Sequence, residues 1–418
     1  MAQQTQFVQR HSKLSGAVFA QALVFSWLAQ SDASYDQLAQ TAAALGVPIS
    51  AQGMAERFTP TAAQFLKVLL AQAVQQVIRA APVAIPLLER FNGVYLQDST
   101  VVTLPNALAH LWRGCGGTDK TTNQAGLKVQ VQLNLSDGQL THLDLQAGRS
   151  QDRAAPMQTT PLPKGALRLA DLGYFAVPTL RTYDQQGVFW LTRYYTPCEI
   201  LDAQGNALDL VKLLQRTTRN RFDLAIQLSY EHRLSCRLVA VRVSPAVAAA
   251  RRRKAHAHAK REGITLSEKV LTFLEWTLLV TNVPVCFLTV DELLVLARVR
   301  WQIELLFKLW KGQGQLNCSR RSKPYALLCE VYAKLLGLVV QHWLLLGHTW
   351  HYANRSWQKV AQTLRHHSLS LVYALSAPAA LSNLFATLAR CFAVGARLNA
   401  RKTQPNTVQL LCNVPECP

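Results

Sequence analysis

Apolar residues recur at helical spacing at both ends of the chain and alternate with polar residues in its middle. This change of period predicts helices over residues 1–85, strands mixed with helices over 90–285, and helices again afterwards. The N-terminal helices are predicted at Phe7–Ala29, Tyr35–Leu45, Ser50–Phe58 and Thr61–Ala80.

Two serines and one turn organise this N-terminal region. Ser34 and Ser50 stand where their hydroxyls can cap helices, and Gly46–Pro48 turns the chain between them. Two short helices around a glycine-containing turn are the pattern of a helix-turn-helix, and equally of an ordinary helical hairpin. Both interpretations stay open from these residues alone.

Two buried strands in the middle of the chain are each followed by an aspartate. A short strand over residues 94–97 ends at Asp98, and a strand over 166–170 ends at Asp171. In mixed sheets, functional sites gather at the C-terminal ends of strands. We therefore expect both carboxylates at such an edge.

The elements around these strands predict a mixed sheet with flanking helices. Residues 127–135 and 141–145 alternate, and the turn Ser136–Gly138 joins them as a hairpin. A helix over 177–186 and a strand over 188–193 follow. The order is three strands, a strand, a helix and a strand, which indicates an α/β fold.

Residues 195–285 differ from the sequence on either side. Strands are predicted at Leu224–Tyr230, Cys236–Val243 and Trp276–Thr281, and the densest basic run of the chain, Arg251–Arg261, lies among them. We interpret this stretch as a β-rich insertion that interrupts the sheet. The basic run is either a phosphate-binding surface or simply a solvated helix.

After the insertion, the pattern returns to helical spacing. The tail from Arg401 is polar and is expected to fray. The predicted helices are Asp291–Lys311, Pro324–Gly347, Trp357–Arg365 and Leu381–Val394.

The helix that reaches Lys311 combines an apolar face with a charged stripe. At about 100° per residue, Arg300, Glu304, Lys308 and Lys311 fall within an arc of roughly 80°. One carboxylate therefore lies among cations. Taken alone, this is the ordinary pattern of a surface glutamate with partners one or two turns away. The apolar residues of the adjoining face are Ile303, Leu306, Phe307 and Trp310.

The charge balance favours an anionic partner. Lys plus Arg number 44 against 24 Asp plus Glu, a net charge of +20, in a chain of 418 residues that is half apolar. A folded protein with such a surface favours nucleic acid, with an acidic membrane as the competing partner. The most apolar segment, Leu335–Leu346, is interrupted by Gln341 and His342 and is shorter than the ~20 residues of a bilayer span. We expect a buried helix there and no membrane segment.

The cysteines give no sign of a metal site or a disulfide framework. There are nine, an odd number, and they show no C-x-x-C pair and no zinc-type spacing with histidine. This usage is typical of buried thiols in a reducing cytosol. His256 and His258, in the basic run, are not expected to bind metal.

Three carboxylates stand out as a possible catalytic set: Asp98, Asp171 and Glu304. Brought together they would repel, and such a set is unstable without a cation. Magnesium suits it, because Mg²⁺ prefers oxygen ligands and often takes a few carboxylates with phosphate oxygens. Two such ions could activate water and hold the leaving oxygen of a phosphodiester, with neighbouring Lys and Arg steadying the phosphate.

The local sequences around these acids resemble those of a known family. Asp98 in Y-L-Q-D-S-T, Asp171 in L-A-D-L-G-Y-F and Glu304 in R-W-Q-I-E-L-L-F-K-L-W-K are similar to the DDE transposases of bacterial insertion sequences. More narrowly, Arg300, Glu304 and Lys311 fit the Tyr-x2-Arg-x3-Glu-x6-Lys signature of the insertion sequence four branch. The Tyr position falls on Ala297 and departs from that signature.

The resemblance implies a fold and a division into domains. The family has a ribonuclease H-like mixed sheet flanked by helices and interrupted by a β-rich insertion before the Glu helix. The 304 − 171 = 133 residues between the last two acids leave room for it. The implied regions are 1–85 (helical, DNA-binding), 90–194 (first part of the catalytic core), 195–285 (insertion), 286–350 (second part of the core) and 351–418 (helical, dimerisation).

The resemblance also implies roles for individual residues. Asp98, Asp171 and Glu304 would bind two Mg²⁺ or Mn²⁺ ions, and Arg300, Lys308 and Lys311 would contact the transposon-end DNA. In some relatives a Trp at the place of Trp276 stacks on a flipped base, and strand packing is the simpler alternative here. Within the basic run, Arg253, Lys254 and Lys260 are expected to contact phosphates.

The implied activity is cut-and-paste transposition of double-stranded DNA by a homodimer, in the bacterial cytosol at the nucleoid. Water would attack the phosphodiester at each end, and the freed 3′-hydroxyl would attack target DNA. A catalytically inactive DNA-binding relic or inhibitor of transposition is the main alternative, because Ala297 departs from the signature. A stand-alone metal nuclease fits the acids but gives the basic insertion no role.

Overall fold

The computed structural model describes residues 1–10, 13–116, 124–319, 321–352, 354–399 and 406–412. Its chain divides into two compact units. Unit 1 comprises Met1–Ile85, Asp98–Ser150 and Trp301–Gln409, and unit 2 comprises Pro86–Gln97, Gln151–Arg300 and Leu410–Pro418. Each unit therefore contains segments that are distant in sequence.

Unit 1 begins with four helices whose starts are fixed by side-chain caps. The hydroxyls of Ser15, Ser34, Ser50 and Thr59 each accept a hydrogen bond from a backbone N–H of the first turn. Ser34 completes a capping box with Gln37, so the predicted helix start after Ser34 is confirmed. The helices are α1 (Gly16–Ala29), α2 (Tyr35–Ala44), α3 (Ala51–Glu56) and α4 (Pro60–Gln75).

Two of these helices are shorter than predicted. The first was expected from Phe7, but it starts at Gly16 because Ser15 caps it. The fourth was expected to reach Ala80, but the backbone turns extended at Gln76. Apolar residues at helical spacing occur before the start of α1 and after the end of α4, so periodicity alone overestimates the length of both helices.

The β2–β3 hairpin of unit 1 forms as predicted. Strand β2 (Ala125–Asn134) pairs antiparallel with β3 (Leu140–Ala147), with Leu127 opposite Ala147. Gly138 takes a positive φ of 75° in the turn. Every residue of β2 is buried, so this strand belongs to the interior of unit 1.

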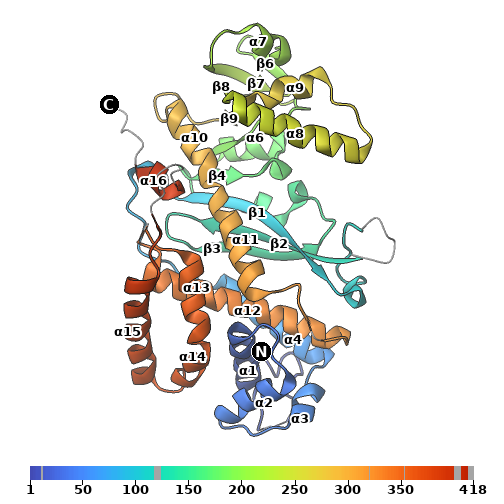
Figure 1. Ribbon diagram of the computed structural model, residues 1–418, viewed down its shortest axis with the longest axis vertical. Helices are drawn as coiled ribbons and strands as arrows, with labels where there is room; N and C mark the ends of the chain where they lie inside the picture. The colour runs from blue at the N-terminus through green and yellow to red at the C-terminus, as the bar shows by residue number, and fades with distance from the viewer. Residues whose placement is uncertain (11–12, 117–123, 320, 353, 400–405, 413–418) are drawn as a thin grey trace. The chain divides into compact units, whose positions relative to one another are not determined.

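Helix α12 (Pro324–Thr349) is the core helix of unit 1. It packs against α1 and α4, and it passes between these helices and the β2–β3 hairpin (Figure 1). It is long and apolar enough to cross a bilayer by length and composition, and 83% of its most apolar window is buried in the protein. The prediction of a buried helix is confirmed.

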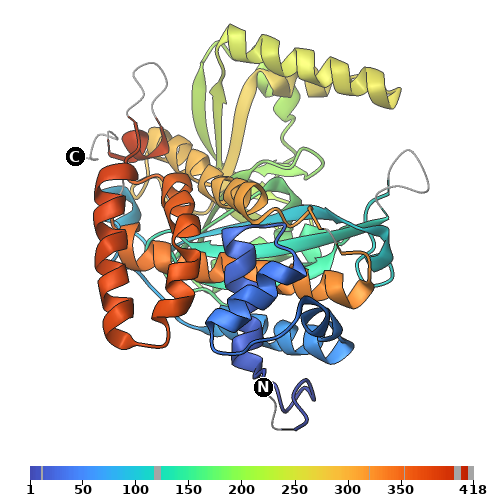
Figure 2. The same cartoon turned by 60° about the horizontal axis from the view of Figure 1, so that its bottom comes forward.

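Helix α12 also bonds to the turn of the hairpin. His342 donates from Nε2 to the Gly138 carbonyl at 2.7 Å, and the Trp350 indole donates to the Leu135 carbonyl at 3.2 Å. Beyond α12 the chain forms α13 (Trp357–His366), α14 (Ser368–Ala374) and α15 (Pro378–Gly395), which pack together (Figure 2). Sequence patterns missed α14 and the short α16 (Thr407–Cys412). The predicted fraying from Arg401 falls largely on residues outside the described ones.

Unit 2 is organised around parallel strand pairing. The first residues of β1 (Val94–Leu104) pair in parallel with β4 (Leu167–Ala170), and β4 pairs in parallel with β5 (Phe189–Arg193). Helix α6 (Val177–Gln185) connects β4 to β5 and packs on β5. The predicted strand–helix–strand order is confirmed.

The strands of the predicted insertion pair with this sheet and extend it. Strand β9 (Trp276–Thr281) pairs antiparallel with β5, and β8 (Leu234–Arg242), β7 (Arg221–Leu228) and β6 (Ile200–Asp202) follow outward. Sequence patterns missed β6 and the short helices α7 and α9. The helices of this region are α7 (Leu210–Arg216), α8 (Pro245–Glu262) and α9 (Glu268–Leu274).

The outer side of β6 is covered by its own chain. Leu208 donates its backbone N–H to the Ile200 carbonyl at 2.9 Å, and Asp202 donates to the Asn206 carbonyl at 2.8 Å. The Asp202 carboxylate also accepts from the backbone N–H of Asn206, and from that of Gln204, and these hydrogen bonds lower its pKa. The loop therefore folds back along the strand.

Within the described residues, the strands follow the order β3-β2-β1-β4-β5-β9-β8-β7-β6, a mixed and mostly antiparallel sheet with flanking helices. The predicted α/β class agrees with it, and the region predicted as a β-rich insertion does contain strands, which pair antiparallel. The ribonuclease H-like assignment stays a prediction. The remaining short elements are α5 (Pro86–Glu89), η1 (Asn106–Leu108), η2 (Asp152–Ala154), η3 (Pro156–Thr159) and η4 (Leu172–Tyr174).

The single helix predicted over Asp291–Lys311 is in fact two. Helix α10 (Val290–Val299) ends at Val299 with Arg300 as its C-cap, and α11 (Trp301–Gly314) begins directly after Arg300. The stretch contains neither proline nor glycine before Gly312, so no sequence signal marks the break. The boundary between the two units falls at the same place.

The turn at Gly138 leads to a first prediction. A Cβ added there would lie 2.2 Å from Leu346 Cδ2 and 2.6 Å from two atoms of the Trp350 ring. We expect Gly138→Ala to lower the free energy of unfolding by about 1–3 kcal/mol more than backbone strain alone. Gly46→Ala is the matched control, because Gly46 has φ +84° and open space around it. Equal losses in urea unfolding of the two variants would contradict the contact.

His342 leads to a second prediction. Burial lowers its pKa to about 4 from the ordinary 6.5, so the neutral ring is favoured in the folded protein. Its contribution to stability is fully present above pH 6.5 and is lost as the pH falls towards 4. His342→Gln can still donate to the Gly138 carbonyl but does not titrate. Its free energy of unfolding should depend less on pH between 6.5 and 4 than that of the wild type, as measured by urea denaturation.

Candidate functional site

Helix α11 presents Glu304 on the boundary between an apolar face and solvent. Ile303 and Trp310 are 0% and 2% exposed, and Glu304 is half-buried. Lys308 and Lys311 are exposed, and the Lys308 ammonium lies 4.2 Å from the centre of the Trp301 ring. The predicted apolar face of this helix is confirmed. The DNA contacts of both lysines stay a prediction.

Asp98 lies within a strand and not at its end. The sequence predicted a strand that stops at Asp98, but β1 continues to Leu104. The residues after Asp98 alternate between buried and exposed positions, as strand residues do. The half-buried Asp98 carboxylate accepts a hydrogen bond from the Ser99 N–H at 2.8 Å through Oδ1. Its position in unit 1 is therefore fixed by strand geometry.

Asp171 follows β4 directly, as predicted, and starts the 3-10 turn η4. Its carbonyl accepts from the Tyr174 N–H at 3.0 Å. Its carboxylate is 41% exposed, and Arg300 Nη2 lies 3.7 Å from Oδ1. A partly exposed pair of this kind contributes little to stability. The pair does place a cation beside an accessible carboxylate.

The side chain of Arg300 is more buried than that of Asp171. Its side chain is 16% exposed, and it stands at the C-terminal end of α10, where a cation is favourable. The sequence predicted that Arg300 contacts DNA. The structure gives it a protein partner in unit 2, and DNA contact stays a prediction.

The donor chemistry of the acids suits a hard divalent cation, since carboxylate oxygen is the ligand that Mg²⁺ and Mn²⁺ prefer. In the described ranges of the chain, no group of three or more His, Cys, Asp or Glu side chains is placed to hold a metal ion. Asp98 and Glu304 belong to unit 1 and Asp171 to unit 2. The sharing of ions by the three acids therefore stays a prediction.

The basic run of unit 2 forms the helix α8. Ser244 caps its start and Gly263, at φ +66°, ends it. Arg253, Lys254 and Lys260 are exposed along it, so the two sequence interpretations of a solvated helix and a phosphate-binding surface both remain compatible with the structure. Arg251 differs, because its guanidinium donates to the Trp276 carbonyl at 2.8 Å.

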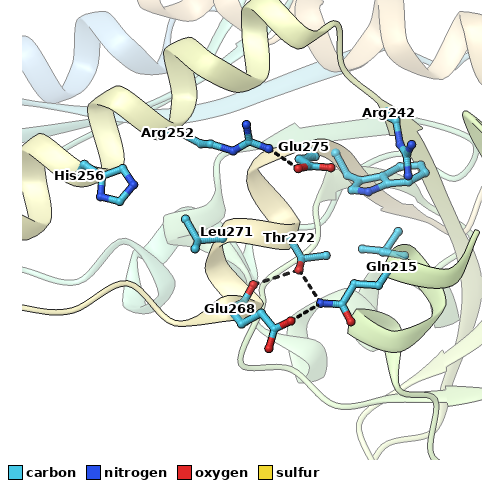
Figure 3. Close-up of a pocket in the computed structure, with 10 residues that line it drawn as sticks. Gln215, Arg242, Arg252, His256, Glu268, Leu271, Thr272 and Glu275 are labelled. Carbon is cyan, nitrogen blue, oxygen red and sulfur yellow. Dashed lines mark hydrogen bonds and ion pairs between the residues drawn. The ribbon is translucent and has the colours of Figure 1, made fainter.

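A pocket of about 500 Å³ lies between α7, α8 and α9 and the strands beneath them (Figure 3). Arg252 forms an ion pair with Glu275 across it, and Gln215 donates to the Glu268 carboxylate at 2.9 Å. Both signs of charge therefore line the pocket.

Trp276 packs into the wall of this pocket. It is 2% exposed, and the Arg242 guanidinium lies 4.8 Å from the centre of its ring. Phe222 packs beside it with ring centroids 5.4 Å apart. In this conformation the ring is covered by protein, as the strand-packing alternative expects. Base stacking by Trp276 stays a prediction.

A comparison with known protein families shows to which family the chain belongs. The family model described as "Transposase DDE domain" matches residues 89–336, more than half of the chain. The chain belongs to the transposase DDE domain family. The match includes all three predicted acids.

Named relatives of this transposase-family chain agree. It is similar to the transposases for insertion sequence elements IS231C of Bacillus thuringiensis subsp. berliner (28% identical over 365 residues) and IS231F of subsp. israelensis (28% over 363). It is also similar to that for IS1151 of Clostridium perfringens (24% over 365). These matches cover 81% of this chain and 75–76% of each relative. An insertion-sequence transposase is supported, whereas the four branch and its signature stay a prediction.

Sequence reasoning missed Arg242 and the pairing of Arg300 with Asp171. Arg242 reaches Trp276 because β8 and β9 place these two residues opposite each other in an antiparallel pair. This register depends on a loop and two helices between the strands, which leave no local signal. The Arg300 pairing joins residues 129 positions apart, 300 − 171 = 129.

The burial of Trp276 gives a third prediction. We expect Trp276→Ala to lower the free energy of unfolding by about 3–5 kcal/mol, the range for removing a buried aromatic side chain. Trp301→Ala is the control, since Trp301 is 44% exposed, and it should change stability far less. Urea unfolding followed by circular dichroism measures both. A small loss at Trp276 would mean that its ring is accessible in solution.

Proposed function

We propose that this chain is an active DNA transposase that cuts the ends of its insertion sequence and joins them to target DNA. The observation that carries the proposal is the family match over residues 89–336, which spans Asp98, Asp171 and Glu304 together. The names of the relatives, all transposases of insertion sequences, support it. They do not favour the alternative of an inactive relic.

The three acids would hold two Mg²⁺ or Mn²⁺ ions, which supply charge stabilisation and a more acidic water when bound. Arg300 would keep the Asp171 carboxylate oriented through its ion pair. Lys308 and Lys311 on α11, with Arg253, Lys254 and Lys260 on α8, are exposed cations suited to phosphate oxygens. Three exposed cations along the single helix α8 suit a polyanion better than a small anionic ligand.

The reaction would proceed by two displacements at phosphorus. The oxygen of a water molecule forms a bond to the phosphorus at the transposon end, and the 3′-oxygen leaves and takes up a proton. That 3′-hydroxyl then attacks a target phosphodiester, so that one P–O bond forms as another breaks. No covalent protein intermediate is required, and no Ser or Tyr nucleophile is assigned.

The partner would be double-stranded DNA, at the terminal inverted repeats and at the target, and the net charge of +20 supports this. Residues 1–85 would add DNA contacts. Because two ends must be held together, at least a homodimer is expected on DNA, through the helices of 351–418. We place the protein in the bacterial cytosol at the nucleoid.

A fourth prediction tests the activity. Purified protein with Mg²⁺ should cut DNA that carries its own terminal inverted repeats and join the ends to a target. Asp98→Ala, Asp171→Ala and Glu304→Gln should each reduce cutting by more than about 100-fold, since direct ligands matter more than the outer partners that cost 10–100-fold. End binding in gel-shift assays should persist.

Asp291→Asn is the matched control for these variants. Asp291 lies in the same family-matched interval, but its carboxylate is 66% exposed and pairs with Arg221. It should cut like the wild type. Specific end binding by the wild type without metal-dependent cutting would instead indicate the relic. Cutting without joined products would indicate a stand-alone nuclease.

A further inference from the structure

Arg168 is a fully buried arginine in the strand that leads to Asp171. It lies in β4, is 1% exposed, and pairs in register with Tyr95 of β1. Its strand ends two residues later, and Asp171 follows. Burial lowers its pKa, although arginine stays charged at neutral pH. A permanent cation therefore lies inside unit 2.

The hydrogen-bond partners of Arg168 are side-chain amides. Nε donates to Gln97 Oε1 and Nη2 donates to Gln158 Oε1, both at 2.6 Å. The guanidinium also lies 5.1 Å from the centre of the Tyr183 ring. Among the residues that the structure describes, no carboxylate lies within ion-pair distance of Arg168. Two short bonds from one rigid fork thus fix two glutamines.

Each glutamine passes this constraint to a backbone segment. Gln158 donates from Nε2 to the Tyr174 carbonyl at 3.1 Å, and Tyr174 ends the turn η4 that Asp171 begins. Gln97 donates to the Met157 carbonyl at 3.5 Å. The Tyr183 hydroxyl donates to the Gln158 carbonyl at 3.2 Å and fixes the same segment from α6. Gln97 and Tyr183 therefore fix the segment 157–158 from two sides, and Gln158 of that segment bonds the turn after Asp171.

The same network reaches the residue before Asp98. Gln97 and Ala170 are register partners in the parallel pair of β1 and β4. Asp98 and Asp171 are the residues that directly follow these two in the sequence. The Arg168–Gln97 bond lies across this pair, so it acts on both strands just before each aspartate.

An apolar side chain would fill this interior position at lower cost. Burying a charge without a counter-charge is unfavourable by several kcal/mol before hydrogen bonds compensate it. Packing alone therefore gives no reason for arginine here. A guanidinium group can hold two acceptors in a fixed geometry, because its N–H donors lie in one rigid plane. Neither an apolar side chain nor lysine can do this.

We propose that Arg168 is a positioning residue of the transposase reaction, which sets the backbone at Asp98 and Asp171 through Gln97 and Gln158. This inference rests on the proposed function of the two aspartates. Arg168 does not touch substrate or metal. It acts as outer partners of metal ligands do, by fixing the direction of the ligands.

The test compares Arg168→Lys, which keeps the charge but loses the fork, with the wild type. Amide hydrogen exchange of metal-free protein should become at least about 10-fold faster at residues 172–174, since their support is lost. Mn²⁺ affinity, measured by calorimetry, and cutting per folded molecule should each fall by about 10–100-fold. End binding should stay within about twofold, since no DNA-binding cation is removed.

Arg237→Lys is the matched control. Arg237 is a buried arginine of β8 in the same unit, and its fork bonds Asp223 and the carbonyls of Val283 and Leu288. Arg237→Lys should lower the free energy of unfolding but should leave hydrogen exchange at residues 172–174, Mn²⁺ affinity and cutting per folded molecule unchanged. Arg168→Met is a second variant, whose folded fraction is measured separately so that a folding defect is not mistaken for a loss of function. It should reproduce the changes in hydrogen exchange and in Mn²⁺ affinity.

The outcomes separate this inference from the proposed function. If Arg168→Lys matches Arg237→Lys in exchange, Mn²⁺ affinity and cutting, Arg168 only packs the interior and the inference is overturned. If the wild type neither binds Mn²⁺ nor cuts its ends, the proposed function fails and the positioning role falls with it. In that case, faster exchange at 172–174 would still show the mechanical support.

Discussion

The parallel pairing of β1 with β4 is the constraint on which the rest of unit 2 depends. Parallel neighbours need a long connection, and here it includes the whole β2–β3 hairpin. The pairing ends with Gln97 opposite Ala170. Asp98 and Asp171 are the next residues of the two strands, so the register of this one pair fixes the position of the backbone just before each of them. A shift by one residue would turn every side chain of a strand to the opposite face. The buried Arg168 fork across these strands opposes such a shift.

Much of the fold could be predicted from local signals in the sequence. Ser34 and Ser50 mark helix starts, and the Ser136–Gly138 turn marks the hairpin, because caps and turns depend on a few neighbouring residues. Helix ends were predicted less well, as at Gln76, because apolar spacing can continue after the backbone leaves the helix. The break at Arg300 had no local signal at all.

Long-range pairing marks the limit of sequence reasoning for the site as well. Asp98, Asp171 and Glu304 could be singled out because each stands in its own short motif. The contacts of Arg242 with Trp276, of Arg168 with Gln97 and of Arg300 with Asp171 join residues 34, 71 and 129 positions apart, which no spacing rule predicts. Trp276 shows the same limit. The sequence singled it out, but it did not predict that Arg242 and Phe222 pack against its ring.

The loop that folds back on β6 has a consequence for assembly. The last strand of a sheet normally exposes a row of backbone donors and acceptors, to which a foreign strand can add. Here Leu208 and Asn206 of the same chain already use the outer groups of Ile200 and Asp202. The strand is also only three residues long. This end of the sheet therefore offers little template for edge-to-edge growth, so a strand from a second copy of the protein would find few free backbone groups at β6.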